Sequence, residues 1–372
     1  MPVEIACRKV SVPAEKLESW EDGSAQPTIN QAETLAKAYK RPFAVFFLPK
    51  VPRDFTLLQD FRAKTSAPLG TGAIFIMREI QQKQQWLREL YADNKEQPLP
   101  FVGRFTVASN PQEVAADILA TLGINPAAYA TTVPLREWIN KAEAKGICVS
   151  RTSFIHSNLK LDSEEFQGFV IADNLAPFVF VNSDDWDAPQ LFTLVHELAH
   201  IWIAESGITN VSRSGAELKD RFHPTELFCN EVAANALMPA LIMQGLARNA
   251  LNSYDGIRQA AKRIGVSTLA MLYRSLKMGL LPLETYSKHK KQAEAEFWAF
   301  EKLEAEKKAK QKAAGKKGGP NYYTLQLGKN GKLFTQIVID AFNGGVIPPT
   351  QASNLLNVQV SKFSVYDSII HQ

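Results

Sequence analysis

The feature that most constrains this chain is a pair of histidines four residues apart, His196 and His200, inside an apolar run. The run from Gln190 to Ala204 contains neither glycine nor proline, so it predicts a buried helix. Residues i and i+4 lie on one face of a helix, one turn apart. Both imidazoles should therefore point the same way and be able to bind one metal ion. Glu197 is rotated by about 100° from His196, so it flanks such an ion without having to bind it.

The pattern H-E-x-x-H is typical of zinc sites in which a carboxylate takes a proton from a water molecule. The competing interpretation is a helix whose two histidines are merely buried and hydrogen-bonded. The chain has only six histidines, and two of them lie in this motif. This concentration favours the metal site.

A catalytic zinc ion has three protein ligands and one open position, so a third ligand must come from elsewhere. The longer pattern H-E-x-x-H-x-x-G-x-x-H is excluded, because Ile203 and Ser206 occupy the places of its glycine and third histidine. The strongest candidate is Glu226, in a helix that Pro224 begins and that stops before Pro239. Small residues on this helix would let it approach the first helix closely.

Alternatives to this third ligand remain open in the sequence. Glu231, on the same helix, and Glu217, in the preceding loop, are the other candidates. Glu226 has a competing interpretation as an exposed first-turn carboxylate that the helix dipole stabilises. The group that stabilises the oxyanion cannot be read from the sequence, and the candidates are His223, His156 and Tyr254.

Three motifs stand in an order that resembles a known family. They are the strand-like run at 177–182, the run F-T-L-V-H-E-L-A-H at 192–200, and E-x-x-C-N-x-V-A-A-x-x-L-M-P at 226–239. Together they resemble the ImmA/IrrE family of zinc metallopeptidases, closely over 165–240 and more loosely over 146–285. Val195, Ala199 and Ala236 depart from the usual family pattern, and none of these differences removes a ligand.

The resemblance implies a Zn²⁺ cofactor held by His196, His200 and Glu226, with Glu197 as the general base. It also implies a cytoplasmic endopeptidase whose substrate is a regulatory protein, such as a helix-turn-helix repressor or an antitoxin-like partner. The competing function is a DNA-binding transcriptional regulator whose zinc site is structural or silent.

The overall pattern predicts an α+β protein that is mainly helical, with a zincin-like core of a small sheet and the H-E-x-x-H helix. We expect the strand at 177–182 to lie beside the cleft and to hold an extended substrate by β-addition. Breaks in composition predict five segments. They are a partial helix-turn-helix at 1–50, a helical connecting region at 51–145, the peptidase domain with a helix-turn-helix-like tail at 146–285, a Lys/Glu-rich helix and linker at 286–320, and a small helical module at 321–372.

The N-terminal segment resembles part of an XRE/Cro-type helix-turn-helix through its W-E-x-G…P-T pattern. Only about nine residues precede its turn, so we expect this segment to lack the first helix of a complete module. The expected recognition helix at 13–22 carries four acidic residues and one lysine. Because affinity for duplex DNA depends on Lys and Arg neutralising phosphates, a structural or protein-contact role is favoured over DNA binding.

The net charge of +4 is unevenly distributed. Ten lysines and five glutamates lie between residues 288 and 320, which leaves the rest of the chain with one more acidic than basic residue. The bulk of the protein is therefore not a basic nucleic-acid binder. The charged segment predicts a solvated helix and linker, with a weak contact to nucleic acid or an acidic partner as the alternative. The basic helical pair at 257–276 is expected to support the peptidase fold.

Composition also predicts the compartment. No stretch reaches the ~18 uninterrupted apolar residues that a membrane-spanning helix needs, and Met1–Glu4 lacks the features of an export signal. The three cysteines are far apart in the sequence and lack C-x-x-C spacing. They predict reduced thiols in a cytoplasmic protein rather than disulfides or a zinc ribbon.

Overall fold

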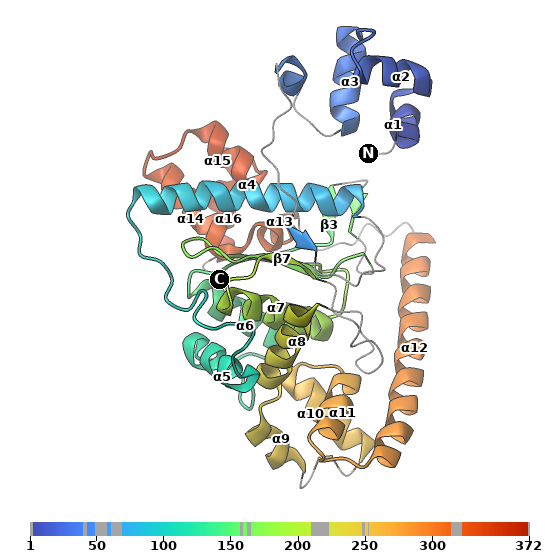
Figure 1. Ribbon diagram of the computed structural model, residues 1–372, viewed down its shortest axis with the longest axis vertical. Helices are drawn as coiled ribbons and strands as arrows, with labels where there is room; N and C mark the ends of the chain where they lie inside the picture. Colours follow the sequence, from blue (N-terminus) through green and yellow to red (C-terminus); the bar gives the residue numbers. More distant parts are fainter. Residues whose placement is uncertain are drawn as a thin grey trace. The chain divides into compact units, whose positions relative to one another are not determined.

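The computed structural model describes residues 3–39, 43–48, 58–60, 69–156, 159–161, 165–209, 223–247, 250–251, 253–313 and 322–370. The chain divides into two compact units, Met1–Leu57 and Leu58–Gln372 (Figure 1). No helix of these ranges is long and apolar enough to cross a membrane.

The first unit contains three short α-helices and a 3₁₀ turn. They are α1 (Val3–Val10), α2 (Ala14–Glu21), α3 (Ile29–Tyr39) and η1 (Phe43–Phe47). Ala6, Leu17 and Leu35 are buried together and form its small core. The helix expected at 13–22 is present as α2, and the helix-turn-helix assignment stays a prediction.

The second unit is built on a five-stranded mixed sheet in the order β1-β7-β5-β6-β2. Its central strands β5 and β6 are antiparallel, β7 is antiparallel to β5, β2 is parallel to β6, and β1 is parallel to β7. The bounds are β1 (Gln59–Asp60), β2 (Cys148–Arg151), β5 (Gly168–Ile171), β6 (Phe178–Val181) and β7 (Gly207–Thr209). A separate antiparallel pair consists of β3 (Phe154–His156) and β4 (Leu159–Lys160).

The pairing of β6 corrects one expectation from the sequence. The segment 177–182 does form a strand, but β6 is bonded to β2 on one side and to β5 on the other. All four of its residues are buried. Its backbone groups are therefore already used, and it cannot hold an extended substrate by β-addition.

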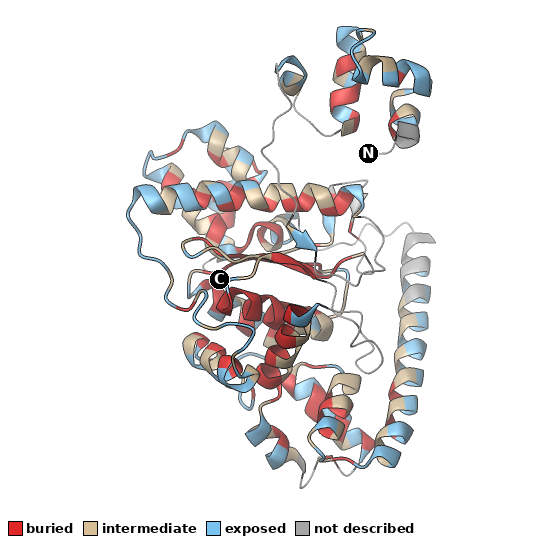
Figure 2. Ribbon diagram, in the orientation of Figure 1, coloured by how far each residue is buried: buried red, intermediate tan, exposed pale blue. Residues whose placement is uncertain are grey.

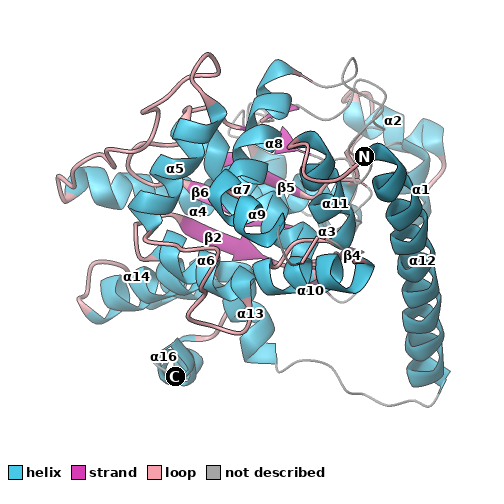
Figure 3. Ribbon diagram, turned by 90° about the horizontal axis from the view of Figure 1, so that it is seen from below, coloured by secondary structure: helices cyan, strands magenta, loops and turns pink. Residues whose placement is uncertain are grey.

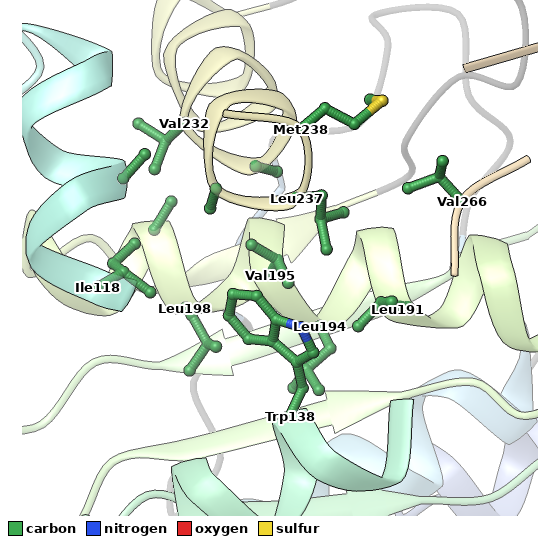
Figure 4. Close-up of a cluster of buried hydrophobic side chains, with 14 of the residues drawn as sticks. Ile118, Trp138, Leu191, Leu194, Val195, Leu198, Val232, Leu237, Met238 and Val266 are labelled. Atoms are coloured by element: carbon green, nitrogen blue, oxygen red, sulfur yellow. The ribbon is translucent and has the colours of Figure 1, made fainter. Parts of the chain in front are cut away.

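One face of the sheet is covered by α6 (Pro134–Glu143) and α7 (Asp187–Trp202). Figure 3 shows α7 lying across β5 and β6. Behind α7 pack α8 (Pro224–Leu237) and α5 (Pro111–Leu122). Both α7 and α8 are largely buried (Figure 2). Trp138 lies among Leu194, Leu198 and Leu237 in this core (Figure 4).

The opposite face is covered by α4 (Thr71–Asp93) and by the C-terminal helices. These are α13 (Tyr322–Asn330), α14 (Lys332–Asn343), α15 (Pro349–Leu356) and α16 (Phe363–Ile370). Phe334 on α14 packs edge-on against Trp86 of α4 and Phe178 of β6, with ring centroids 5.8 and 5.6 Å apart. The C-terminal helices are thus part of the same packed unit as the sheet.

The remaining helices lie beyond α8. They are α9 (Ala240–Ala247), α10 (Tyr254–Ile264), α11 (Thr268–Lys277) and α12 (Leu283–Ala313). Arg274 on α11 is buried and donates hydrogen bonds to Asn235 (2.6 Å) and to the Met238 carbonyl (3.3 Å). Trp186, just before α7, packs against Phe300 of α12 with centroids 4.8 Å apart. These contacts tie α11 to α8 and α12 to the start of α7.

Candidate metal centre

Three predicted ligands come together where α7 crosses the first turn of α8. One ligand atom each of His196, His200 and Glu226 lies within 4.8 Å of the other two. The two Nε2 atoms are 3.2 Å apart, and Glu226 places Oε1 3.1 Å from His200 Nε2 and Oε2 3.3 Å from His196 Nε2. All three side chains are buried. Two residues on one helix face and a third on a crossing helix thus form one compact donor set.

The packing of α8 determines which glutamate reaches this place. Pro224 is the first residue of the helix, as the sequence predicts, and His223 is its N-cap. Glu226 lies in the first turn, yet it is only 1% exposed, so the interpretation as an exposed first-turn carboxylate is wrong. Glu231 lies on an exposed part of the helix and pairs with Lys277. Glu217 lies outside the described residues.

The two histidines control the charge of Glu226. Burial alone would raise the pKa of Glu226, but the attraction and hydrogen bonds of His196 and His200 outweigh burial and lower this pKa to about 2. Burial likewise opposes the charged form of His196, but Glu226 outweighs it and raises the pKa of His196. For His200 burial prevails and its pKa is lowered. The centre therefore holds a carboxylate that is ionised at neutral pH.

Asn230 orients the first histidine. Its Oδ1 lies 3.0 Å from His196 Nδ1. An amide oxygen can only accept, so Nδ1 carries the proton and Nε2 offers its lone pair to the cluster. Asn230 lies one turn after Glu226 on α8, so one helix supplies both the third ligand and the group that fixes the tautomer of the first.

Glu197 is fully buried and stays outside the donor set. Its Oε1 accepts a hydrogen bond from the Thr209 hydroxyl on β7, while its Oε2 has no hydrogen-bond partner among the described residues. Burial raises the pKa of Glu197 to about 8. One oxygen is thus anchored and the other is available to exchange a proton.

Gly168 on β5 makes room for this carboxylate. A Cβ atom at this position would lie 2.8 Å from Glu197 Oε1, 2.7 Å from Thr193 Cγ2 and 2.9 Å from the Phe180 carbonyl oxygen. Neither Gly168 nor Thr209 was recognised from the sequence as part of the site. Thr209 lies in β7, and a strand of only three residues is too short to give a periodic signal in the sequence.

The donor set fits the metal that the sequence implies. Two imidazole nitrogens and one carboxylate oxygen are ordinary zinc ligands, and three of them leave one position open. Two buried Nε2 atoms that face each other share at most one proton, whereas a divalent cation would engage the lone pairs of both. A site made only for hydrogen bonding between histidines would not need the third, ionised group.

Tyr254 and His223, two of the candidates for oxyanion stabilisation, make contacts with residues outside the donor set. The Tyr254 hydroxyl donates to Glu296 of α12 at 2.8 Å, and the Tyr254 ring packs against His289 with centroids 5.5 Å apart. The His223 ring faces its own helix, with Nδ1 3.4 Å from the Thr225 amide nitrogen. The side chain of His156 lies outside the described part of the chain.

A comparison with known protein families finds a match for residues 142–276. This stretch matches the family model described as the IrrE N-terminal-like domain, Peptidase_M78. The match contains His196, Glu197, His200 and Glu226, and it supports a metallopeptidase of the ImmA/IrrE type in this part of the chain. It leaves out α1–α5, most of α6, and α12–α16. No curated protein sequence matches the chain.

Proposed function

We propose that this protein is a zinc-dependent endopeptidase that cleaves a regulatory protein, such as a helix-turn-helix repressor or an antitoxin-like partner. His196, His200 and Glu226 hold the ion, and Glu197 is the general base. The observation that carries the proposal is the buried convergence of these three side chains beside a second carboxylate, that of Glu197, which lies outside the donor set.

A bound zinc ion would lower the pKa of a water molecule and polarise the scissile carbonyl. Glu197 accepts the water proton at Oε2 and passes it to the leaving amine. Burial favours the proton-bound form of this carboxylate and so raises its pKa, which helps Glu197 to keep the proton between the two steps. Thr209 and Gly168 keep its position while the proton moves.

The competing function, a DNA-binding regulator with a silent zinc site, has less support. Glu15, Glu18 and Glu21 lie on α2, the expected recognition helix, and would repel phosphate. Arg274 of the basic helical pair is buried against α8 and so is not available to DNA.

The test uses the full chain and a helix-turn-helix repressor encoded by a neighbouring gene. The wild-type protein should cleave the repressor at a defined bond, read as new N-termini by mass spectrometry. Glu197→Gln should slow cleavage by about 10²- to 10⁴-fold, the usual contribution of general acid–base catalysis, and should keep its zinc. Cleavage at the wild-type rate by Glu197→Gln would refute the role of Glu197.

A further inference from the structure

A cavity of about 300 Å³ lies between α4 and α15, on the face of the sheet opposite α7 (Figure 1). Its volume is at the lower end of the range of small-molecule sites, about 300–1,000 Å³. Apart from Leu355 its lining residues are polar, and they are Glu79, Gln82, Lys83, Thr350, Gln351 and Asn354. The proposed peptidase mechanism does not use this cavity.

Lys83 is a buried cation at the wall of this cavity. The residue is 3% exposed, and its Nζ donates to Glu79 Oε1 at 2.9 Å and to Asn330 Oδ1 at 2.7 Å. An ammonium group has three protons, and the described residues offer no acceptor for the third. The Phe334 ring lies on another side of the ammonium, with its centroid 5.7 Å from Nζ. A buried lysine with a spare donor therefore borders an open space.

The charges around Lys83 do not balance. Lys329, which is 4% exposed, pairs with the second oxygen of Glu79 at 2.8 Å. Two ammonium groups thus share one carboxylate, and one formal positive charge is left over. Burial lowers the pKa of Lys83 although Glu79 opposes this. Because buried charges need a partner, an anion in the cavity would stabilise the charged form of Lys83.

The first turn of α15 adds donors from the other side of the cavity. Its N-cap, Pro348, provides no side-chain cap, and Pro349 has no backbone N–H. The Gln351 N–H bonds to the Pro348 carbonyl at 3.0 Å, whereas the Thr350 N–H has no hydrogen-bond partner in the part of the chain that the structure describes. Free N–H groups and the helix dipole favour an anion at this end of a helix.

We propose that the cavity between α4 and α15 binds a small organic anion, whose phosphate or carboxylate group accepts hydrogen bonds from Lys83 and from the start of α15. Two independent features support this assignment, a buried cation with a spare donor and an uncapped helix N-terminus that face the same space. The ligand would join α4 to the C-terminal helices. The inference goes beyond the proposed peptidase function and does not depend on it.

The test measures the Kd of two radiolabelled probes for the full-length protein, by equilibrium dialysis at pH 7 and constant ionic strength. The probes are inorganic phosphate and succinate. Saturable binding of phosphate alone supports a phosphorylated ligand, and saturable binding of succinate alone supports a carboxylate. If neither probe binds saturably at millimolar concentrations, the proposal is overturned.

Gln351→Glu is the decisive variant, because it keeps the shape of the side chain and places a negative charge in the cavity wall. An acidic residue is favourable in the first turn of a helix, so this variant should fold. Its Kd should rise by about tenfold or more, as expected when a hydrogen bond to a charged group is lost. Lys83→Met should weaken binding at least as much, and circular dichroism checks that both variants are folded.

Gln359→Glu is the matched control. It makes the same charge change at an exposed residue outside the cavity lining, so its Kd should equal that of the wild type. An unchanged Kd in Gln351→Glu, or an equal increase in Gln351→Glu and Gln359→Glu, would refute the site.

His196→Ala separates this cavity from the metal centre. Anion binding in the cavity should persist in His196→Ala and be lost in Lys83→Met. The opposite pattern would place the anion at the metal centre and overturn the proposal. Anion binding in the cavity, together with no cleavage of any protein by the wild-type chain, would refute the peptidase function and leave the anion site standing.

Discussion

At the scale of single residues, Thr209 and Glu197 form the pair on which the proposed proton transfer depends. The Thr209 hydroxyl holds one carboxylate oxygen, and both side chains are fully buried. Thr209→Val keeps the shape of the side chain and removes the donor. We expect kcat to fall by about tenfold or more, the value of a hydrogen bond to a charged group, with KM and zinc content nearly unchanged.

Thr209→Ser is the control for this prediction. Serine restores the hydroxyl and should recover most of kcat, which a purely structural role of the threonine methyl would not allow. Serine and valine variants with the same kcat would show that Thr209 does not position Glu197.

The raised pKa of Glu197 predicts how the stability of the metal-free protein depends on pH. The ordinary value is 4.5, and burial raises the pKa in the folded protein to about 8. The folded state therefore binds a proton that the unfolded chain has lost between these two values, and stability should fall as the pH rises from about 4.5 to 8. Glu143, whose pKa burial raises to about 7, acts in the same direction.

The measurement is the urea midpoint of chelator-treated protein at pH 5 and pH 8. The wild type should lose stability between the two, and Glu197→Gln should lose clearly less, because an amide does not titrate. Glu143→Gln should remove only the Glu143 contribution. An identical loss in the wild type and in Glu197→Gln would mean that Glu197 does not titrate in this window.

At the scale of elements, the sequence predicts those helices and strands that contain a clear apolar run or are bounded by proline. The apolar run from Gln190 to Ala204 predicts α7, and Pro224 and Pro239 predict the limits of α8. The strand-like run at 177–182 predicts β6. By contrast, β1 and β7 have two and three residues and form only because the sheet offers partners, which no local pattern can show.

Gly168 shows how an element adapts to the site. Its absent side chain lets the Glu197 carboxylate and Thr193 pack directly against β5. Gly168→Ala should destabilise the protein by about 1–3 kcal/mol, as overpacking of a tight core usually does, and should displace Glu197. Gly245→Ala on α9 is the control, since a Cβ there meets no atom within 4 Å. The urea midpoint and kcat of both variants check this prediction, and equal behaviour would contradict it.

At the scale of the whole molecule, contacts between distant parts of the chain were beyond sequence reasoning. The sequence predicts a helical segment at 321–372, but not where it packs. Lys329 on α13 and Lys83 on α4 both pair with Glu79, at 2.8 and 2.9 Å. Because Lys329 comes from a segment far away in the sequence, no local pattern predicts this buried group.

The same limit applies to the candidate site. Spacing alone predicts that His196 and His200 share a face, and it leaves the third ligand open among Glu226, Glu231 and Glu217. The packing of α8 on α7 brings Glu226 into the cluster and leaves Glu231 at the surface. The choice between them is a tertiary property, because both glutamates are equally compatible with the helix.

The most direct test of the three-ligand centre is the zinc content of purified full-length protein after dialysis, by inductively coupled plasma mass spectrometry. The wild type should hold about one zinc per chain, as a site with three protein ligands and one open position predicts. Glu231→Gln, on the same helix, should match it, whereas His196→Ala and Glu226→Gln should lose most of the metal. Full occupancy in Glu226→Gln or in His196→Ala, with the fold intact, would contradict the account.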